Sequence, residues 1–162
     1  MSAKTYTQIL SLLDANGCAY STQHHEPTLT SEIAARVRGV ALSSGAKAIV
    51  AKGHKTGMNF LFVMPAHLKL DSVAAKQVVG EAVGFEPDPK AVTDCVPGSV
   101  PPFGSLFNVK TFVDPRLAEN ETIHFNAGEL TDSVSMPYMA YIEIEKPMIV
   151  RIAKESETKE PT

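Results

Sequence analysis

Two apolar segments joined by a short polar loop constrain the fold of this chain most strongly. Residues 46–52 and 59–65 are rich in aliphatic and aromatic side chains, and the loop 53–58 between them is polar and contains two glycines. Apolar runs of this length are typical of buried strands, and a glycine-containing loop of this size is typical of a hairpin. The sequence therefore predicts an antiparallel pair of strands here.

Helices are predicted where apolar residues recur at helical spacing and a capping residue or a glycine marks an end. These segments are residues 5–16, 30–39 and 70–79, with a single helical turn at 90–95. Pro137 can occupy the first position of a further helix over 138–144. Residues 141–144 alternate, however, and fit a strand equally well.

Short segments rich in β-branched and aromatic residues predict the remaining strands. They are residues 18–24, 82–85, 108–113, 122–125, 132–136 and 148–152. Because strands and helices do not alternate regularly, a doubly wound parallel sheet is disfavoured. We predict one α+β domain over residues 1–152, with a mixed, mainly antiparallel, barrel-like sheet surrounded by helices. Residues 153–162 are expected to form a charged, mobile tail.

Composition narrows the partners of the protein. With 162 residues, 44% of them hydrophobic, the chain can bury one real core. A net charge of −3 argues against binding to DNA or to long RNA through a basic face. Cys18 and Cys95 form no disulfide framework, and neither a signal peptide nor a membrane span is recognisable. We expect a cytoplasmic protein without a membrane partner.

One lysine and one rigid loop predict a ligand pocket. Lys47 enters an apolar strand, where an ammonium group is costly unless it meets an anion or an oxygen-rich ligand. Residues 97–104 contain three prolines and two glycines, which can hold backbone groups towards a small molecule. Alternatively, Lys47 is an edge lysine whose head reaches water, and the loop is a stiff connection.

Other reactive groups have weaker patterns. His24 and His25 are neighbours on a predicted strand, so they point to opposite faces and predict no metal site. Ser99 lacks the frame and the base of a serine nucleophile, and we expect it to be a pocket wall. Gly98 and Gly104 match neither of the common nucleotide-binding loops.

Several segments together resemble the YbaK/ProX family, the free-standing relatives of the editing domain of bacterial prolyl-tRNA synthetases. Lys47 is followed some fifty residues later by Gly98 to Pro102, which matches the GxxxP loop of that family. The resemblance extends over about residues 5–144. Its segments are residues 25–28, 30–35, 38–39, 45–50, 65–71, 98–104 and 125–128.

The resemblance implies an aminoacyl-tRNA deacylase that hydrolyses the ester of a mischarged small amino acid, with proline tRNA as the expected carrier. It implies no metal or organic cofactor. Lys47 would hold the substrate, and the backbone at Gly98 would fix the aminoacyl carbonyl, so both are expected to be catalytic. The expected substrate-binding residues are His25, Thr28, Val40, Leu42, Ser99, Val100, Pro101, Pro102, Phe103, Gly104, Asn126, Ala127 and Gly128.

The resemblance leaves the amino acid open. Asn126 stands where the alanine-clearing subfamily carries a histidine, and a polar wall would accept a hydroxyl or a thiol. The acidic chain is expected to touch only the acceptor end of tRNA, with or without a synthetase as partner. Two other functions compete with the deacylase hypothesis. One is a non-catalytic module that senses an amino acid or docks to a synthetase, and the other is a hydrolase that uses Ser99 or Cys95. The latter is disfavoured by the missing base and acid.

Overall fold

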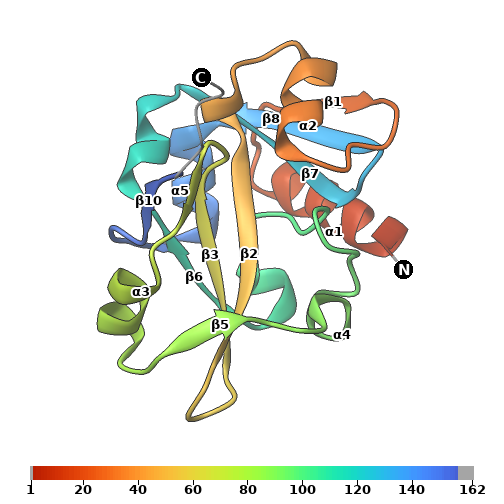
Figure 1. The fold of residues 1–162 in the computed structure, drawn as a ribbon. Coiled ribbons are helices and arrows are strands. Elements are labelled where there is room, and N and C mark those ends of the chain that lie inside the picture. Colours follow the sequence, from red (N-terminus) through yellow and green to blue (C-terminus); the bar gives the residue numbers. More distant parts are fainter. Residues whose placement is uncertain (1, 157–162) are drawn as a thin grey trace.

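The computed structural model describes residues 2–156 (Figure 1). Strands, α-helices and short 3₁₀ helices (η) follow one another without regular alternation. In chain order they are α1 (Ser2–Ala15), β1 (Ser21–His24), α2 (Ser31–Arg38), η1 (Leu42–Ser44), β2 (Ala46–Gly53), β3 (Asn59–Pro65), β4 (Leu68–Leu70), α3 (Ser72–Val79), β5 (Val83–Phe85), α4 (Pro89–Thr93), η2 (Gly104–Phe107), β6 (Lys110–Val113), η3 (Pro115–Glu119), β7 (Thr122–Glu129), β8 (Asp132–Pro137), α5 (Tyr138–Glu145), β9 (Met148–Ile149) and β10 (Ala153–Glu155).

The predicted hairpin lies in the largest sheet, whose strand order is β5-β2-β3-β6-β9. β2 and β3 are antiparallel, from Ala46 opposite Pro65 to Lys52 opposite Asn59, whereas β3 pairs with β6 and β6 with β9 in parallel. The other described sheets have the orders β1-β8-β7 and β10-β4, and all their pairs are antiparallel. The predicted mixed α+β fold is confirmed.

The sheets do not close into the expected barrel. β5 covers the free edge of β2 only at its far end, opposite residues 51–53. Near the start of β2, the link to the β1-β8-β7 sheet is an isolated bridge between Gly45 and His124. One bridge does not make a continuous hydrogen-bond ladder, so the two larger sheets stay separate. We call the line where they meet, next to Gly45 and His124, the seam.

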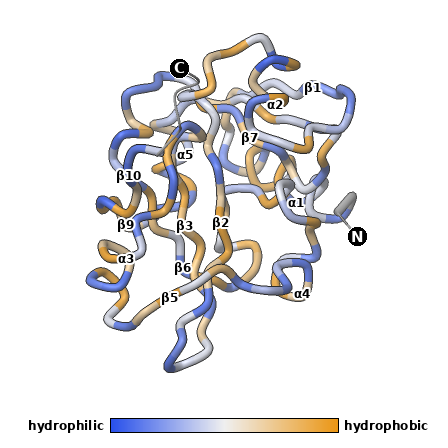
Figure 2. The backbone as a smooth tube through the Cα atoms, viewed as in Figure 1, coloured by the Kyte–Doolittle hydropathy of each residue, from blue (hydrophilic) through white to orange (hydrophobic). Residues whose placement is uncertain are grey.

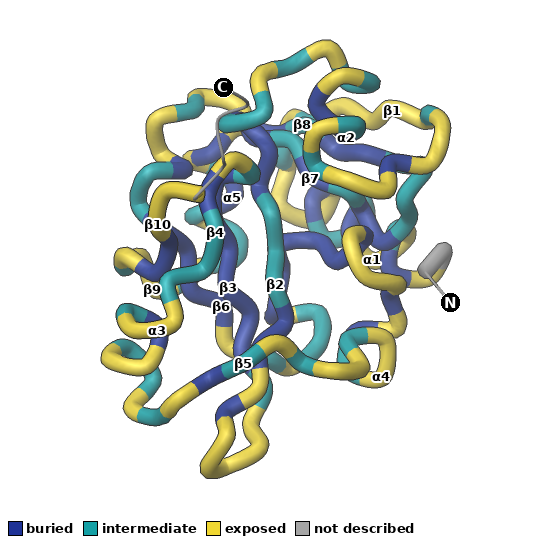
Figure 3. The backbone as a smooth tube through the Cα atoms, in the orientation of Figure 1, coloured by how far each residue is buried: buried dark blue, intermediate teal, exposed yellow. Residues whose placement is uncertain are grey.

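Two hydrophobic cores lie on opposite faces of the large sheet. Alternation along β3 directs Leu61 and Val63 into one core and Phe60, Phe62 and Met64 into the other. Figure 2 shows apolar residues along the paired strands and a polar loop at the hairpin tip. Figure 3 shows β3 and β6 buried, while β1 is exposed. The first core also receives α1 and α5, and the second lies beneath α3.

The ambiguous segment after Pro137 is a helix. In α5, Tyr141 is fully buried, and its ring packs edge-on against Phe103 with centroids 5.2 Å apart. Its hydroxyl donates to Pro102 O at 2.7 Å. Burial and this hydrogen bond therefore outweigh the local alternation that also fits a strand.

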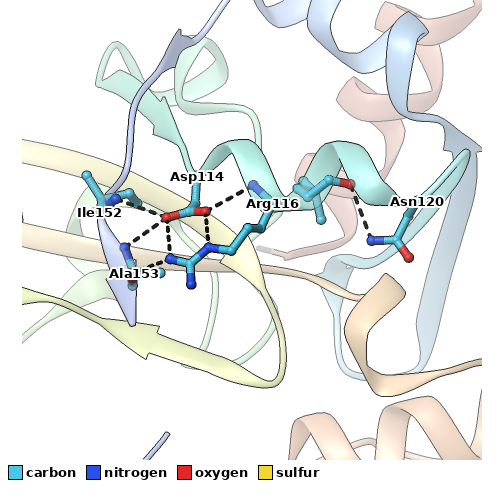
Figure 4. Close-up of polar contacts among 6 residues, drawn as sticks. Asp114, Arg116, Asn120, Ile152 and Ala153 are labelled. Atoms are coloured by element: carbon cyan, nitrogen blue, oxygen red, sulfur yellow. Dashed lines mark hydrogen bonds and ion pairs between the residues drawn. The ribbon is translucent and has the colours of Figure 1, made fainter. Parts of the chain in front are cut away.

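A buried carboxylate attaches the C-terminal part of the chain to the fold (Figure 4). Asp114, which is fully buried, accepts hydrogen bonds from Arg116 Nε at 2.9 Å and Arg116 Nη2 at 3.0 Å. It also accepts from the backbone amides of Ile152 and Ala153, both at 3.0 Å. These bonds place β10 beside β4, so residues 153–155 are a strand and not the start of the expected mobile tail. Residues 157–162 of that tail lie outside the described residues.

None of the helices within residues 2–156 has the length and apolar character needed to cross a membrane.

Candidate functional site

A cavity of about 360 Å³ opens at the seam between the two larger sheets. Its walls come from the loop before α2, from α2 and η1, from the start of β2, from Gly98 and from β7. The lining is mostly small, with six alanines. Six of the residues predicted from the sequence lie in this wall: Thr28, Leu42, Lys47, Gly98, Val100 and Asn126.

Lys47 lies half-buried in the cavity wall. Alternation on β2 places its side chain on the same face as Ile49, and Nζ donates to the carbonyl of Leu68 in β4. An ammonium group has three N–H donors, so two remain for a ligand. Burial lowers the pKa of Lys47, and the negative charge of Glu32 partly opposes this shift.

Arg38, at the end of α2, is the second cation of the cavity. Its Nε donates to Ser133 Oγ at 2.8 Å, and Nη2 donates to Asn126 Oδ1 at 2.9 Å. Burial lowers the pKa of Arg38 to about 10, and no carboxylate within residues 2–156 forms an ion pair with it. The guanidinium group therefore remains charged at neutral pH, without a counter-ion. No pattern in the sequence predicts a role for Arg38.

Asn126 in β7 forms hydrogen bonds to the loop of residues 97–104. Its Nδ2 donates to Gly98 O at 2.8 Å and to Thr28 Oγ1 at 3.2 Å. Thr28 in turn donates to Leu130 O at 3.0 Å. Gly98 has φ of +89°, a conformation that a side chain would strain. Three of the predicted residues are thus joined in one hydrogen-bonded group at the wall.

His124 is also part of the wall. Its Nδ1 lies 2.6 Å from Ser135 Oγ. Burial lowers the pKa of His124, and the positive charge of Arg38 lowers it further. The imidazole is therefore neutral at physiological pH and adds no third charge to the cavity.

Replacing His124 by glutamine is expected to flatten the pH dependence of stability on the acid side. The folded-state pKa lies below the unfolded value of 6.5, so the unfolded chain binds more protons. Stability of the parent protein therefore falls as pH drops through 6.5 and levels off below the folded-state pKa. Thermal unfolding at about pH 7.5 and about pH 5 measures this, and the variant should lose less Tm than the parent. An equal loss would contradict the buried, neutral imidazole.

Residues 97–104 form the proline loop, and much of this loop passes from the cavity wall into the core. Ser99 is fully buried, and its hydroxyl donates to Val96 O at 2.7 Å. Phe103 is fully buried against Phe125 and Tyr141. These side chains support the wall from behind and do not line it, in contrast to the expectation from the sequence.

The structure gives backbone or packing roles to two other residues of the loop, Pro102 and Gly104. Pro102 O accepts the hydrogen bond from Tyr141. The Gly104 amide donates to Thr111 Oγ1 at 2.9 Å, and a Cβ at this position would lie 2.3 Å from that oxygen. Glycine is therefore required at position 104 by close packing, away from the cavity.

The other predicted binding residues lie around the cavity and outside its lining. His25 Nε2 contacts Ser133 Oγ at 2.7 Å, and the Val40 amide donates to Ala35 O at the end of α2. The Gly128 amide donates to Ser99 O at 2.8 Å, which fastens β7 to the loop. Two further predicted residues, Pro101 and Ala127, are buried.

The adjacent histidines have different partners. His24 Nδ1 lies 2.9 Å from Asp132 Oδ1, whereas His25 contacts Ser133. Nowhere in residues 2–156 do three histidine, cysteine, aspartate or glutamate side chains gather in a way that could hold a metal ion. Cys18 and Cys95 are free thiols.

The cavity is lined by two cationic side chains, by small side chains and by Gly98, whose carbonyl accepts a hydrogen bond from Asn126. The aminoacyl-tRNA editing domain family matches residues 25–144. The chain is 31% identical over 156 residues to the multifunctional Ser/Thr-tRNA deacylase ProXp-y of Escherichia coli (strain K12), with 93% of each chain covered.

Solved structures share the fold. A crystal structure of a hypothetical protein matches with a TM-score of 0.83 and 19% identity, over 90% of this chain and 99% of that one. A protein described as a candidate trans-editing enzyme for prolyl-tRNA synthetase matches with a TM-score of 0.81 and 18% identity, over 93% and 97%. The chain belongs to the aminoacyl-tRNA editing domain family, which confirms the predicted family. The predicted enzyme class, an aminoacyl-tRNA hydrolase, is likewise confirmed.

Proposed function

We propose that this protein is a trans-editing deacylase that removes a small, hydroxyl-bearing amino acid from tRNA in the cytoplasm. The observation that carries the proposal is the cavity itself, in which Lys47 has two N–H donors left and faces walls of small side chains. Serine and threonine are the favoured amino acids. The similar Escherichia coli protein is named a Ser/Thr-tRNA deacylase, and Thr28 and Asn126 supply polar wall atoms here.

In the proposed mechanism, Lys47 holds the terminal phosphodiester or ribose of the tRNA. Water attacks the ester carbonyl, the bond to the ribose oxygen breaks, and the products are a free amino acid and a tRNA with its terminal hydroxyl restored. An aminoacyl ester is already activated, so positioning and stabilisation of the developing oxyanion account for most of the catalysis. The 2′-hydroxyl of the substrate can help to orient the water.

The backbone amide of Gly98 is the proposed oxyanion donor. The neighbouring amide of Ser99 already donates to Val96 O at 3.0 Å, so it is committed within the loop. A donor fixed before the substrate arrives contributes more to catalysis than one that must reorganise. The positive φ of Gly98 sets the direction of that amide, which gives the glycine a catalytic purpose.

The proposed partners are the acceptor end of tRNA and a synthetase that holds this tRNA nearby. A net charge of −3 supports a local contact over a grip along the tRNA. Proline tRNA is the first acceptor to test, because the solved structure with a similar fold is described in relation to prolyl-tRNA synthetase.

The test is hydrolysis of one tRNA charged in turn with serine, threonine, alanine, cysteine and proline. Faster release of serine and threonine than of the other three supports the proposal, and repetition with serine and threonine tRNAs separates the role of the tRNA from that of the amino acid. Selective release of alanine or cysteine would overturn the assigned amino acid. Binding without release of any amino acid would instead indicate a non-catalytic module.

A further inference from the structure

Arg38 directs its guanidinium group at protein atoms of the cavity wall. Two of its three nitrogens donate to Ser133 and Asn126, which are neutral acceptors. We propose that Arg38 is a positioning residue that fixes the Asn126 carboxamide, so that this carboxamide holds the Gly98 carbonyl in place. The inference rests on the proposed function, because it concerns the loop that would face the aminoacyl carbonyl.

The donor and acceptor rules leave one orientation for Asn126. Arginine can only donate, so the atom of Asn126 that faces Arg38 at 2.9 Å must be Oδ1. A backbone carbonyl can only accept, so the atom that faces Gly98 O at 2.8 Å must be Nδ2. Without Arg38, Asn126 Oδ1 loses its shortest hydrogen bond, because the hydroxyls of Thr28 and Ser133 lie 3.4 Å from it. The carboxamide would then be held less firmly, and Gly98 O would lose part of its restraint.

Arg38 is itself held in one direction through Ser133 and His25. His25 Nδ1 lies 2.8 Å from the carbonyl of Glu26 and must donate to it, because a carbonyl can only accept. His25 Nε2 lies 2.7 Å from Ser133 Oγ, and the same oxygen accepts from Arg38 Nε at 2.8 Å. The chain of bonds from His25 to Gly98 is therefore consistent at every atom.

The cost of this arrangement supports a functional purpose. A guanidinium group taken from water without a carboxylate partner loses hydration that neutral acceptors restore only in part. The burial that lowers the pKa of Arg38 expresses the same cost. A neutral residue would be preferred for stability alone, so the charge indicates a requirement for a strong donor towards Asn126.

A double-mutant cycle tests the proposal. Arg38→Met and Asn126→Ala are each expected to lower kcat about 10- to 100-fold, because a small displacement of a catalytic group is costly. The double variant should be no slower than the slower single variant, since both remove the same restraint. In Arg38→Met, KM for charged tRNA should change much less than kcat. Losses that multiply, or a loss in KM alone, would mean that Arg38 binds the substrate directly and would overturn the proposal.

Asn126→Asp provides a second test that keeps size and the contact with Arg38. A carboxylate has no donor for Gly98 O, so this variant is expected to be impaired about as much as Asn126→Ala, roughly 10- to 100-fold. Parental activity in Asn126→Asp would overturn the proposal. The matched control is Asn16→Asp, in which the lost donor bond, to Leu12 O at 2.8 Å, lies on the exposed end of α1. This control should retain parental activity.

The experiments distinguish failure of the deacylase function from failure of the positioning role of Arg38. If the parent protein releases no amino acid from any charged tRNA, the deacylase assignment fails before any variant is compared. If the parent is active and the cycle is multiplicative, only the positioning role fails. Thermal unfolding of each variant confirms that the compared proteins are folded.

Discussion

Lys47→Met is expected to lower kcat/KM for aminoacyl-tRNA hydrolysis by about 100-fold or more, comparable to the loss of a preorganised donor in other enzymes. The ammonium group lies in the cavity wall, partly dehydrated, with one donor on Leu68 O and the others free. Methionine keeps the length of the side chain and removes every donor. The loss should therefore be chemical, with the fold intact.

The matched control for Lys47→Met is Lys52→Met, at the exposed end of the same strand. Single-turnover hydrolysis of seryl-tRNA and threonyl-tRNA gives the rates, and thermal unfolding gives the stability. Because burial disfavours the charge of Lys47, its removal should leave Tm unchanged or higher. A Lys47→Met protein with more than about a tenth of parental activity would refute the assigned role of the lysine.

Asp114→Ala is expected to destabilise the protein by about 3 kcal/mol, the lower end of the cost of breaking a buried ion pair, because the side chain of Arg116 is 21% exposed. The substitution leaves Arg116 without its partner and frees the amides of Ile152 and Ala153. Urea denaturation measures the change. Glu119→Gln, an exposed charge on η3, is the control and should change stability by less than about 0.5 kcal/mol.

The pH dependence gives a second measure of the same group. Burial acts to raise the pKa of Asp114, but hydrogen bonds from Arg116, Ile152 and Ala153 outweigh it and lower the pKa below 3.8. The unfolded chain therefore binds the proton first, so the stabilisation is present above pH 3.8 and is lost as pH falls through the folded-state pKa. Asp114→Asn should lack this acid-side loss. An identical acid profile for both proteins would contradict the ionised carboxylate.

The hairpin and the starts of two helices could be predicted from the sequence, because turn residues and capping residues determine them locally. The hairpin is present, Thr30 accepts from the Ile33 amide at the start of α2, and Asp71 caps α3. Leu70, expected in that helix, lies in β4 instead. β4 and β10 have three residues each and depend on pairing with each other across the chain. Segments this short carry too little periodicity to be recognised.

The site could be predicted only in part for a similar reason. Lys47 is conspicuous because it interrupts an apolar strand, and Gly98 because it opens a proline loop. Arg38 follows an ordinary helical pattern, and its burial arises only when β7 and β8 pack beside α2. Phe103 lies in the core and not in the predicted pocket wall, because local sequence does not reveal where a rigid loop turns into the core.

The C-terminal strand has a practical consequence for anyone who shortens or tags this protein. Glu155 in β10 pairs with Leu68 in β4, and the carbonyl of Leu68 accepts the hydrogen bond from Lys47. A chain ended at Ile152 would keep every residue of the cavity wall but would remove the strand beside β4. Such a shortened protein could lose activity without any change to the residues that touch the substrate, so the boundary for expression belongs after Glu155.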